Sequence, residues 1–178
     1  MIYVPSEDSF LLAECVRLYR GKSALEIGVG SGIILEALVD RFDRVAGTDI
    51  DLEALRSCKP RTGALLVCCD AASAFAPTGK YDLVVSNPPY LPSDESVIDR
   101  TVHGGPTGIE ATINFIESAL PLLVESGRIL VVVSSHAESS SLRSLAAKRN
   151  LKTRLIKQKS LFFETLSVVE LSRANATF

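Results

Sequence analysis

Four short apolar segments of the chain each end in a polar residue, and this pattern constrains the fold most. The polar residues at or directly after the segment ends are Glu26, Asp49, Asp70 and Asn87. Helical periodicity follows the first two segments and, more weakly, the third, which is typical of parallel strands joined by crossover helices. Because open α/β sheets bind ligands beyond the carboxyl ends of their strands, we expect these four side chains to share one site. The segments are residues 23–27, 44–49, 64–69 and 81–86.

The rest of the chain completes a doubly wound sheet. Its last two strands have no helix between them, so they must be antiparallel. We expect an α/β fold with a seven-stranded, mostly parallel sheet and one antiparallel strand at its far end. We also expect a single domain, with an N-terminal helical segment over residues 1–20 and the core over 21–178. The other expected helices and strands are helices 10–19, 33–41, 108–125 and 137–149, and strands 127–134, 151–158 and 163–172.

Composition narrows the functional classes. A hydrophobic content of 47% suits a sheet that is buried on both faces. The net charge of −2 creates no general attraction for nucleic acid. The four cysteines show no metal-ligand spacing, so we expect reduced, mostly buried thiols and a cytoplasmic protein. The longest apolar runs are too short to span a membrane, so we expect no membrane association.

A glycine-rich turn follows the first strand and reads Glu26-x-Gly28-x-Gly30-x-Gly32. Such a turn brings the backbone and helix N-terminal amides close to a ligand. Ile33 stands where the dinucleotide fingerprint needs its third glycine, and Glu26 is a poor neighbour for a pyrophosphate. A cationic ligand such as S-adenosylmethionine fits better. The alternative is a tight turn that needs glycine only for its backbone geometry.

Two aspartates fit the same ligand. Asp49 lies about 20 residues beyond the glycine turn, where an acidic residue accepts from ribose hydroxyls. Asp70 ends the third strand and could accept from an adenine amino group, whereas Asp51 is expected to cap the next helix. Either strand-end aspartate, taken alone, is equally well explained as a polar strand end.

The fourth strand ends abruptly in Asn87-Pro88-Pro89-Tyr90. Two prolines cannot continue a strand, so they fix the Asn87 side chain and the Pro88 carbonyl at its end. These two acceptors can grip one –NH2 group, while Tyr90 supplies a flat face for a planar group. The four residues therefore predict a catalytic site for a planar amide or a nucleobase amine, and no metal is needed. The alternative is a loop without chemistry.

Together, the glycine turn and the Asn-Pro-Pro-Tyr segment resemble class I methyltransferases. Within that class the chain is similar to the eukaryotic and archaeal HemK-type protein glutamine methyltransferases. Further segments that carry this resemblance are 3–12, 48–50, 104–108 and 164–167.

The resemblance implies a substrate and a partner. The family methylates the glutamine of the Gly-Gly-Gln motif in class I translation release factors, and this subtype works with a small zinc-binding activator. An adenine-N6 nucleic-acid methyltransferase and a non-catalytic donor-binding subunit stay open as alternatives. The donor-binding residues expected from the motif and the resemblance are Ser9, Glu26, Gly28, Gly30, Gly32, Asp49, Asp70, Ala71 and Asn87.

The substrate side and one sheet edge carry further expectations. His103 stands where the family more often has an aromatic residue, and a loop histidine is usually a solvated surface residue. The acidic residues Asp94, Glu95 and Asp99 either form a solvated face or meet a basic protein substrate. The uncharged strand 64–69 lies at the sheet margin in this strand order, so we expect the activator to dock there, with a covering helix or loop as the alternative.

Overall fold

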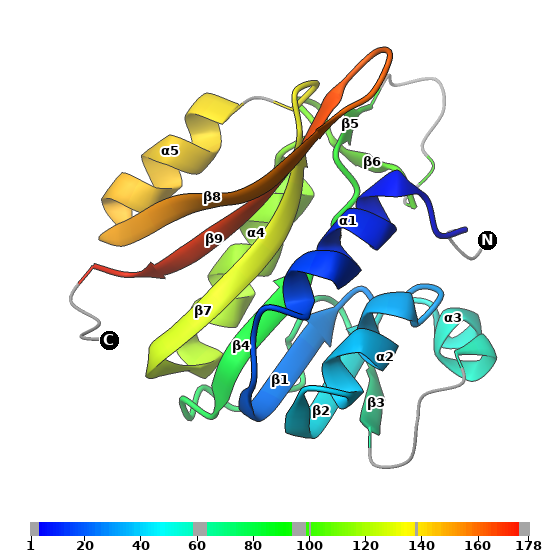
Figure 1. Ribbon diagram of the computed structural model, residues 1–178, viewed down its shortest axis with the longest axis vertical. Coiled ribbons are helices and arrows are strands. Elements are labelled where there is room, and N and C mark those ends of the chain that lie inside the picture. The colour runs from blue at the N-terminus through cyan, green and yellow to red at the C-terminus, as the bar shows by residue number, and fades with distance from the viewer. Residues whose placement is uncertain (1–3, 59–63, 94–98, 100, 138, 175–178) are drawn as a thin grey trace.

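The computed structural model describes residues 4–58, 64–93, 99, 101–137 and 139–174. In this part of the chain, seven strands form one sheet in the order β3-β2-β1-β4-β7-β9-β8, and β5 pairs with β6 in a second sheet (Figure 1). The helices are α1 (Glu7–Val16), α2 (Ile33–Val39), α3 (Leu52–Ser57), α4 (Glu110–Ala119), the 3-10 turn η1 (Leu120–Leu122) and α5 (Ser139–Lys148). The strands are β1 (Gly21–Ile27), β2 (Phe42–Asp49), β3 (Ala64–Cys68), β4 (Tyr81–Ser86), β5 (Leu91–Pro92), β6 (His103–Gly105), β7 (Leu123–Ser134), β8 (Leu151–Ser160) and β9 (Thr165–Arg173).

The predicted sheet is confirmed. Strands β3, β2, β1, β4 and β7 pair in parallel, and β9 runs antiparallel to both β7 and β8. The reversed strand β9 is second from the margin rather than at it. The chain forms β8 at the margin first, and the short connection then brings β9 back between β8 and β7. Strands β3 and β8 are therefore the two margins of the sheet.

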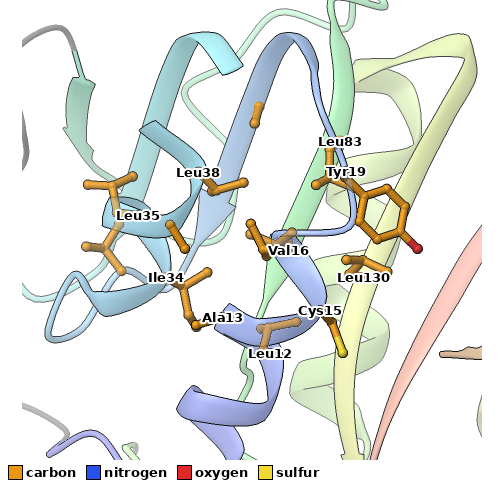
Figure 2. Packing of buried hydrophobic residues seen from close by; sticks show 14 of the residues in the cluster. Leu12, Ala13, Cys15, Val16, Tyr19, Ile34, Leu35, Leu38, Leu83 and Leu130 are labelled. Carbon is orange, nitrogen blue, oxygen red and sulfur yellow. The ribbon is translucent and has the colours of Figure 1, made fainter. Parts of the chain in front are cut away.

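Alternation along the buried strands builds a core on each face of the sheet. Ala24 of β1 joins the cluster under α1 and α2, while its neighbour Leu25 joins the cluster on the opposite face. Figure 2 shows Leu12 of α1 and Leu38 of α2 within the first cluster. Ile116 of α4 lies in the second cluster. Because both faces are covered, the central strands read as continuous apolar runs.

The predicted helix 108–125 is wrong at its end. Helix α4 stops at Ala119, a 3-10 turn covers 120–122, and β7 begins at Leu123 rather than at residue 127. Pro121 explains the early stop, because it has no amide hydrogen for the next helical bond. The weak helix predicted after the third strand is also absent, since residues 71–74 form turns.

The predicted loop 91–105 contains the small second sheet. The Leu91 amide donates to the Val102 carbonyl at 2.9 Å, and the Ser93 amide donates to the Gly105 carbonyl at 2.9 Å. These bonds return the chain to the end of the Asn-Pro-Pro-Tyr segment. Asp94, Glu95 and residue 3 of the N-terminal segment lie outside the described residues.

The cysteine expectation holds only in part. All four thiols are free, and Cys15 and Cys58 are buried, but Cys69 is half-buried and Cys68 is exposed. Cys68 ends β3 at the sheet margin and Cys69 directly follows it, so both thiols are less buried. Among the described helices, none has the length and apolar character needed to cross a bilayer.

Candidate active site

A cavity of about 830 Å³ lies at the carboxyl ends of β1, β2 and β4. Its volume is in the range of small-molecule sites. The glycine turn, the Asn-Pro-Pro-Tyr segment, the first turn of α1 and the β5–β6 region all contribute to its wall. The predicted residues that line it are Ser9, Gly28, Gly30, Asp49, Asp70, Ala71, Asn87, Pro88, Pro89 and Tyr90.

Asp49 is held rigidly at the end of β2. Its Oδ2 accepts from the Gly30 amide at 2.9 Å, and its Oδ1 accepts from the Asp51 amide at 2.8 Å. Each carboxylate oxygen keeps a further lone pair for a ligand hydroxyl. Asp51 caps α3, as predicted, by accepting from the Glu53 amide at 2.9 Å.

Two predicted donor-binding residues, Glu26 and Gly32, do not line the cavity. Glu26 is fully buried in β1, and neither of its carboxylate oxygens has a hydrogen-bond partner in the described part of the chain. Burial and then the Asp49 carboxylate raise the pKa of Glu26 well above its ordinary value. Glu26 therefore sits beneath the glycine turn in surroundings that favour its protonated form.

Gly32 has a packing role at the start of α2. Its φ of +83° lies in the left-handed region, and a Cβ at this position would collide with Sγ of Cys58. Ahead of it, the Gly28 and Val29 amides both donate to the Thr48 carbonyl, at 2.8 and 2.9 Å. The glycine turn is thus fixed between the end of β2 and the segment after α3.

Asn87 is oriented by the first turn of α1. Its Nδ2 donates to Oγ of Ser9 at 3.4 Å, and that hydroxyl donates to Oδ1 of Asp8 at 3.2 Å. Because the Ser9 proton is committed to a carboxylate, Ser9 acts as an acceptor toward Asn87. The Asn87 amide oxygen is buried and has no hydrogen-bond partner among the described residues. The Tyr90 hydroxyl donates to Oδ2, the other carboxylate oxygen of Asp8, at 3.0 Å.

Two glycines pack closely against the backbone of the Asn-Pro-Pro-Tyr segment. A Cβ at Gly104 would collide with the Pro89 carbonyl oxygen, and a Cβ at Gly108 would collide with that of Tyr90. Gly108 also has a φ of +80°. The glycine-rich stretch 104–108 is therefore needed for close approach between the two segments.

The lining residues that ordinarily carry a charge at neutral pH are all acidic. None of the described lining residues is lysine, arginine or histidine. Such a wall favours a cationic ligand and opposes a phosphate. No group of three or more described acidic, histidine or cysteine side chains is arranged to hold a metal ion. The acidic lining residues are Asp8, Asp49, Asp51, Asp70, Asp99 and Glu164.

Several lining residues were not predicted as site residues. Asp8 and Glu164 were noted only as parts of the family-like segments 3–12 and 164–167. Thr101 and Phe115 carried no signal in the sequence, because the β5–β6 pairing and the packing of α4 place them. His103 is half-buried rather than solvated, and its Nδ1 accepts from the Asp99 amide at 3.0 Å.

Known proteins share this fold and these motifs. The family model described as the methyltransferase small domain matches residues 7–162. A protein of Methanocaldococcus jannaschii, provisionally named a protein N5-glutamine methyltransferase, is 30% identical over 94% of this chain and 90% of its own length. The release factor glutamine methyltransferase of Bradyrhizobium diazoefficiens is 32% identical over 72% of this chain, which spans about half of that longer protein (51%).

A solved structure extends the comparison to the whole chain. It is the E. cuniculi Mtq2-Trm112 complex, described as responsible for methylation of the eRF1 translation termination factor. The match has a TM-score of 0.81 and 26% identity, and it covers 97% of this chain and 98% of that one. The fold and the site define a class I methyltransferase. Within this class the chain belongs to the methyltransferase small domain family, among the HemK-type glutamine methyltransferases.

Proposed function

We propose that this protein transfers a methyl group from S-adenosylmethionine to the side-chain amide nitrogen of a glutamine. The acceptor is the glutamine of the Gly-Gly-Gln motif in a class I translation release factor, and the reaction takes place in the cytoplasm. The observation that carries this proposal is the Asn87 amide, whose oxygen lacks a partner among the described residues while its nitrogen is held by Ser9. The named relatives support the same reaction.

The residues of the cavity fit the donor. Asp49 accepts from the ribose hydroxyls, Asp70 accepts from the adenine amino group, and the backbone at Gly28 and Gly30 approaches the amino-acid part. The acidic wall suits the ammonium and sulfonium charges. When bound, the donor supplies a methyl group on a sulfonium, and its leaving group is a neutral thioether. No protein acid is therefore required for departure.

The acceptor is held by two oxygen atoms. Asn87 Oδ1 and the Pro88 carbonyl accept hydrogen bonds from the two amide N–H groups of the substrate glutamine, and the nitrogen releases one of these protons to solvent once it carries the methyl group. An amide nitrogen is a weak nucleophile because its lone pair is delocalised, so the site works by positioning and electrostatics. The Asp8–Ser9 pair ensures that Asn87 presents its oxygen rather than its own NH2 group to the substrate.

A small zinc-binding activator is proposed to dock on β3. This strand has one hydrogen-bonded neighbour, β2, among the described strands. Leu65 on β3 is 59% exposed, and the nearby Ile50 and Leu52 are 59% and 45% exposed. An apolar, uncharged sheet margin of this kind suits strand addition by a partner. The Trm112 component of the similar complex supports a small partner protein.

Two variants test the docking edge. Leu65→Lys should abolish co-purification with the activator and leave the fold intact, because it charges the centre of the margin. Leu155→Lys on β8 is a matched control, since Leu155 is also exposed (54%) but lies at the opposite margin. A soluble, fully active chain without any partner would contradict the docking proposal.

A methyl-transfer assay separates the functional alternatives. Labelled donor is supplied with the protein and either a release factor, adenine-containing DNA or RNA, or no acceptor. The proposal predicts label in the release factor alone. Label in nucleic acid would establish the adenine-N6 alternative, and donor binding without any transfer would establish a non-catalytic subunit.

A further inference from the structure

Two adjacent aromatic side chains project from the tip of the β8–β9 hairpin. Phe162 is 92% exposed and Phe163 is 82% exposed, and these are the two highest values among the exposed large hydrophobic residues described. Their ring centroids lie 4.6 Å apart in an edge-to-face arrangement. Exposed apolar side chains that gather at one point are typical of contact sites.

The hairpin is anchored on both sides of these rings. The Leu161 amide donates to the Glu164 carbonyl at 2.7 Å, and the Leu161 side chain packs against the core. The Glu164 side chain accepts from Oγ of Ser134 at 2.6 Å. Because Leu161 and Glu164 are both fixed, the two residues between them are held outward by the turn.

The tip is continuous with the wall of the active-site cavity. Glu164 lines the cavity, and Phe163 is its direct neighbour in the chain, with Cα atoms about 3.8 Å apart. Figure 1 shows this tip on the same end of the molecule as β5 and β6, and Leu91 of β5 also lines the cavity. A polypeptide that inserts a side chain past Glu164 would therefore lie next to the aromatic pair.

We propose that Phe162 and Phe163 form the docking site for the protein substrate, next to the segment that carries the acceptor glutamine. The site takes an apolar side chain with basic residues near it, because Glu164 directly follows the rings in the chain and the charged residues that line the cavity behind it are all acidic. This inference rests on the proposed function, since it concerns the same cavity and the same substrate.

Charge favours a basic protein segment at this site over an anionic membrane or a second copy of the chain. An anionic membrane would be repelled by the acidic cavity wall next to the rings, and the nearby Lys157 and Lys159 are already paired with Glu14 and Glu7. A second copy of the chain would bring a second acidic wall against the first. A basic protein segment with an apolar side chain is complementary both to the exposed rings and to the acidic residues next to them.

The test compares the Phe162→Ser/Phe163→Ser variant with the wild type in complex with its activator. We expect KM for the whole release factor to rise at least tenfold, while kcat and donor affinity stay unchanged. A Gly-Gly-Gln tripeptide, which has no apolar side chain to pack on the rings, should react equally well with both enzymes. Leu18→Ser is the matched control, since Leu18 is 72% exposed but follows the far end of α1.

A binding readout is independent of turnover. The chain contains no tryptophan, so Phe163→Trp introduces a single indole at the tip. Its emission should shift when release factor is added, relative to the same mixture with the wild-type enzyme. This variant also keeps the aromatic surface, so its KM should stay close to that of the wild type.

The outcomes separate this inference from the proposed function. If the wild type methylates the release factor and the double serine variant has the same KM, the docking inference is wrong and the function stands. If the wild type methylates neither release factor nor tripeptide, the proposed function itself fails. Loss of vesicle binding or of self-association in the variant, with KM unchanged, would assign the rings to a membrane or to a second copy.

Discussion

Replacing Gly32 by alanine tests how the glycine turn is built. The left-handed backbone at φ +83° costs an alanine about 1–2 kcal/mol. The collision of the new Cβ with Sγ of Cys58 adds about 1–3 kcal/mol of overpacking. We therefore expect Gly32→Ala to lower the free energy of unfolding by about 2–5 kcal/mol. In a chain of this length the melting temperature should fall by roughly 2–4 °C for each kcal/mol.

The collision term can be isolated with a double-mutant cycle. Cys58→Ala alone should cost about 1 kcal/mol, because it removes one buried atom. In the Gly32→Ala background it also removes the clash, since the next atom, Cβ of residue 58, is 3.6 Å away. Urea unfolding of the four proteins should therefore give a favourable coupling of about 1–3 kcal/mol.

A second glycine supplies the control. Gly28 has a φ of +79°, but a Cβ there meets only Cε2 of Phe115, at 3.7 Å. Gly28→Ala should cost the backbone strain of about 1–2 kcal/mol and should add to Cys58→Ala without coupling. Additive free energies for Gly32→Ala and Cys58→Ala would refute the packing role assigned to Gly32.

Three further results are expected. Asp49→Ala should weaken donor binding at least tenfold in calorimetry, because a charge-assisted hydrogen bond contributes about 1.5–3 kcal/mol; unchanged affinity would remove Asp49 from the donor site. In urea unfolding, Glu26→Gln should match the wild type in stability near pH 4 and exceed it at pH 8. The raised pKa of Glu26 in the folded state means that wild-type stability falls as pH rises above about 4.5, the ordinary pKa of the unfolded chain. A stability difference that does not change with pH would show that Glu26 titrates normally. Thiol alkylation at pH 8, followed by mass spectrometry, should label the exposed Cys68 before the buried Cys15. Burial raises the pKa of the Cys15 thiol to about 11, so only about one Cys15 in a thousand is a thiolate at pH 8. Equal labelling rates would contradict the burial of Cys15.

The sheet was predictable because its signals are local. Continuous apolar runs mark strands buried on both faces, and the short connection before β9 forces the reversed strand. The start of β7 was missed because Leu123 to Ser126 lacks the apolar run of the central strand, while Pro121 was not weighed against the helical periodicity.

The site was predictable where residues act from strand ends and turns. Asp49 and Asn87 follow directly from their position after a strand. Asp8, Thr101 and Glu164 were not predictable as cavity residues, because each reaches the cavity through packing of a distant element. Glu26 was predicted as a direct donor contact; its side chain is fully buried in β1 and is not among the residues that line the cavity. Sequence spacing does not determine whether a carboxylate at a strand end lines the cavity or is buried beneath the turn.

The most direct test of the proposed reaction is mass spectrometry of a release factor after incubation with the protein and S-adenosylmethionine. The wild type should add one methyl group to the glutamine of the Gly-Gly-Gln motif, and a release factor with asparagine in its place should stay unmodified. Asn87→Ala should lower the rate at least a hundredfold while leaving most of the donor affinity, because the acceptor amide is no longer held in the reacting geometry. Near-normal methylation by Asn87→Ala, or a methyl group on any other residue, would contradict the account.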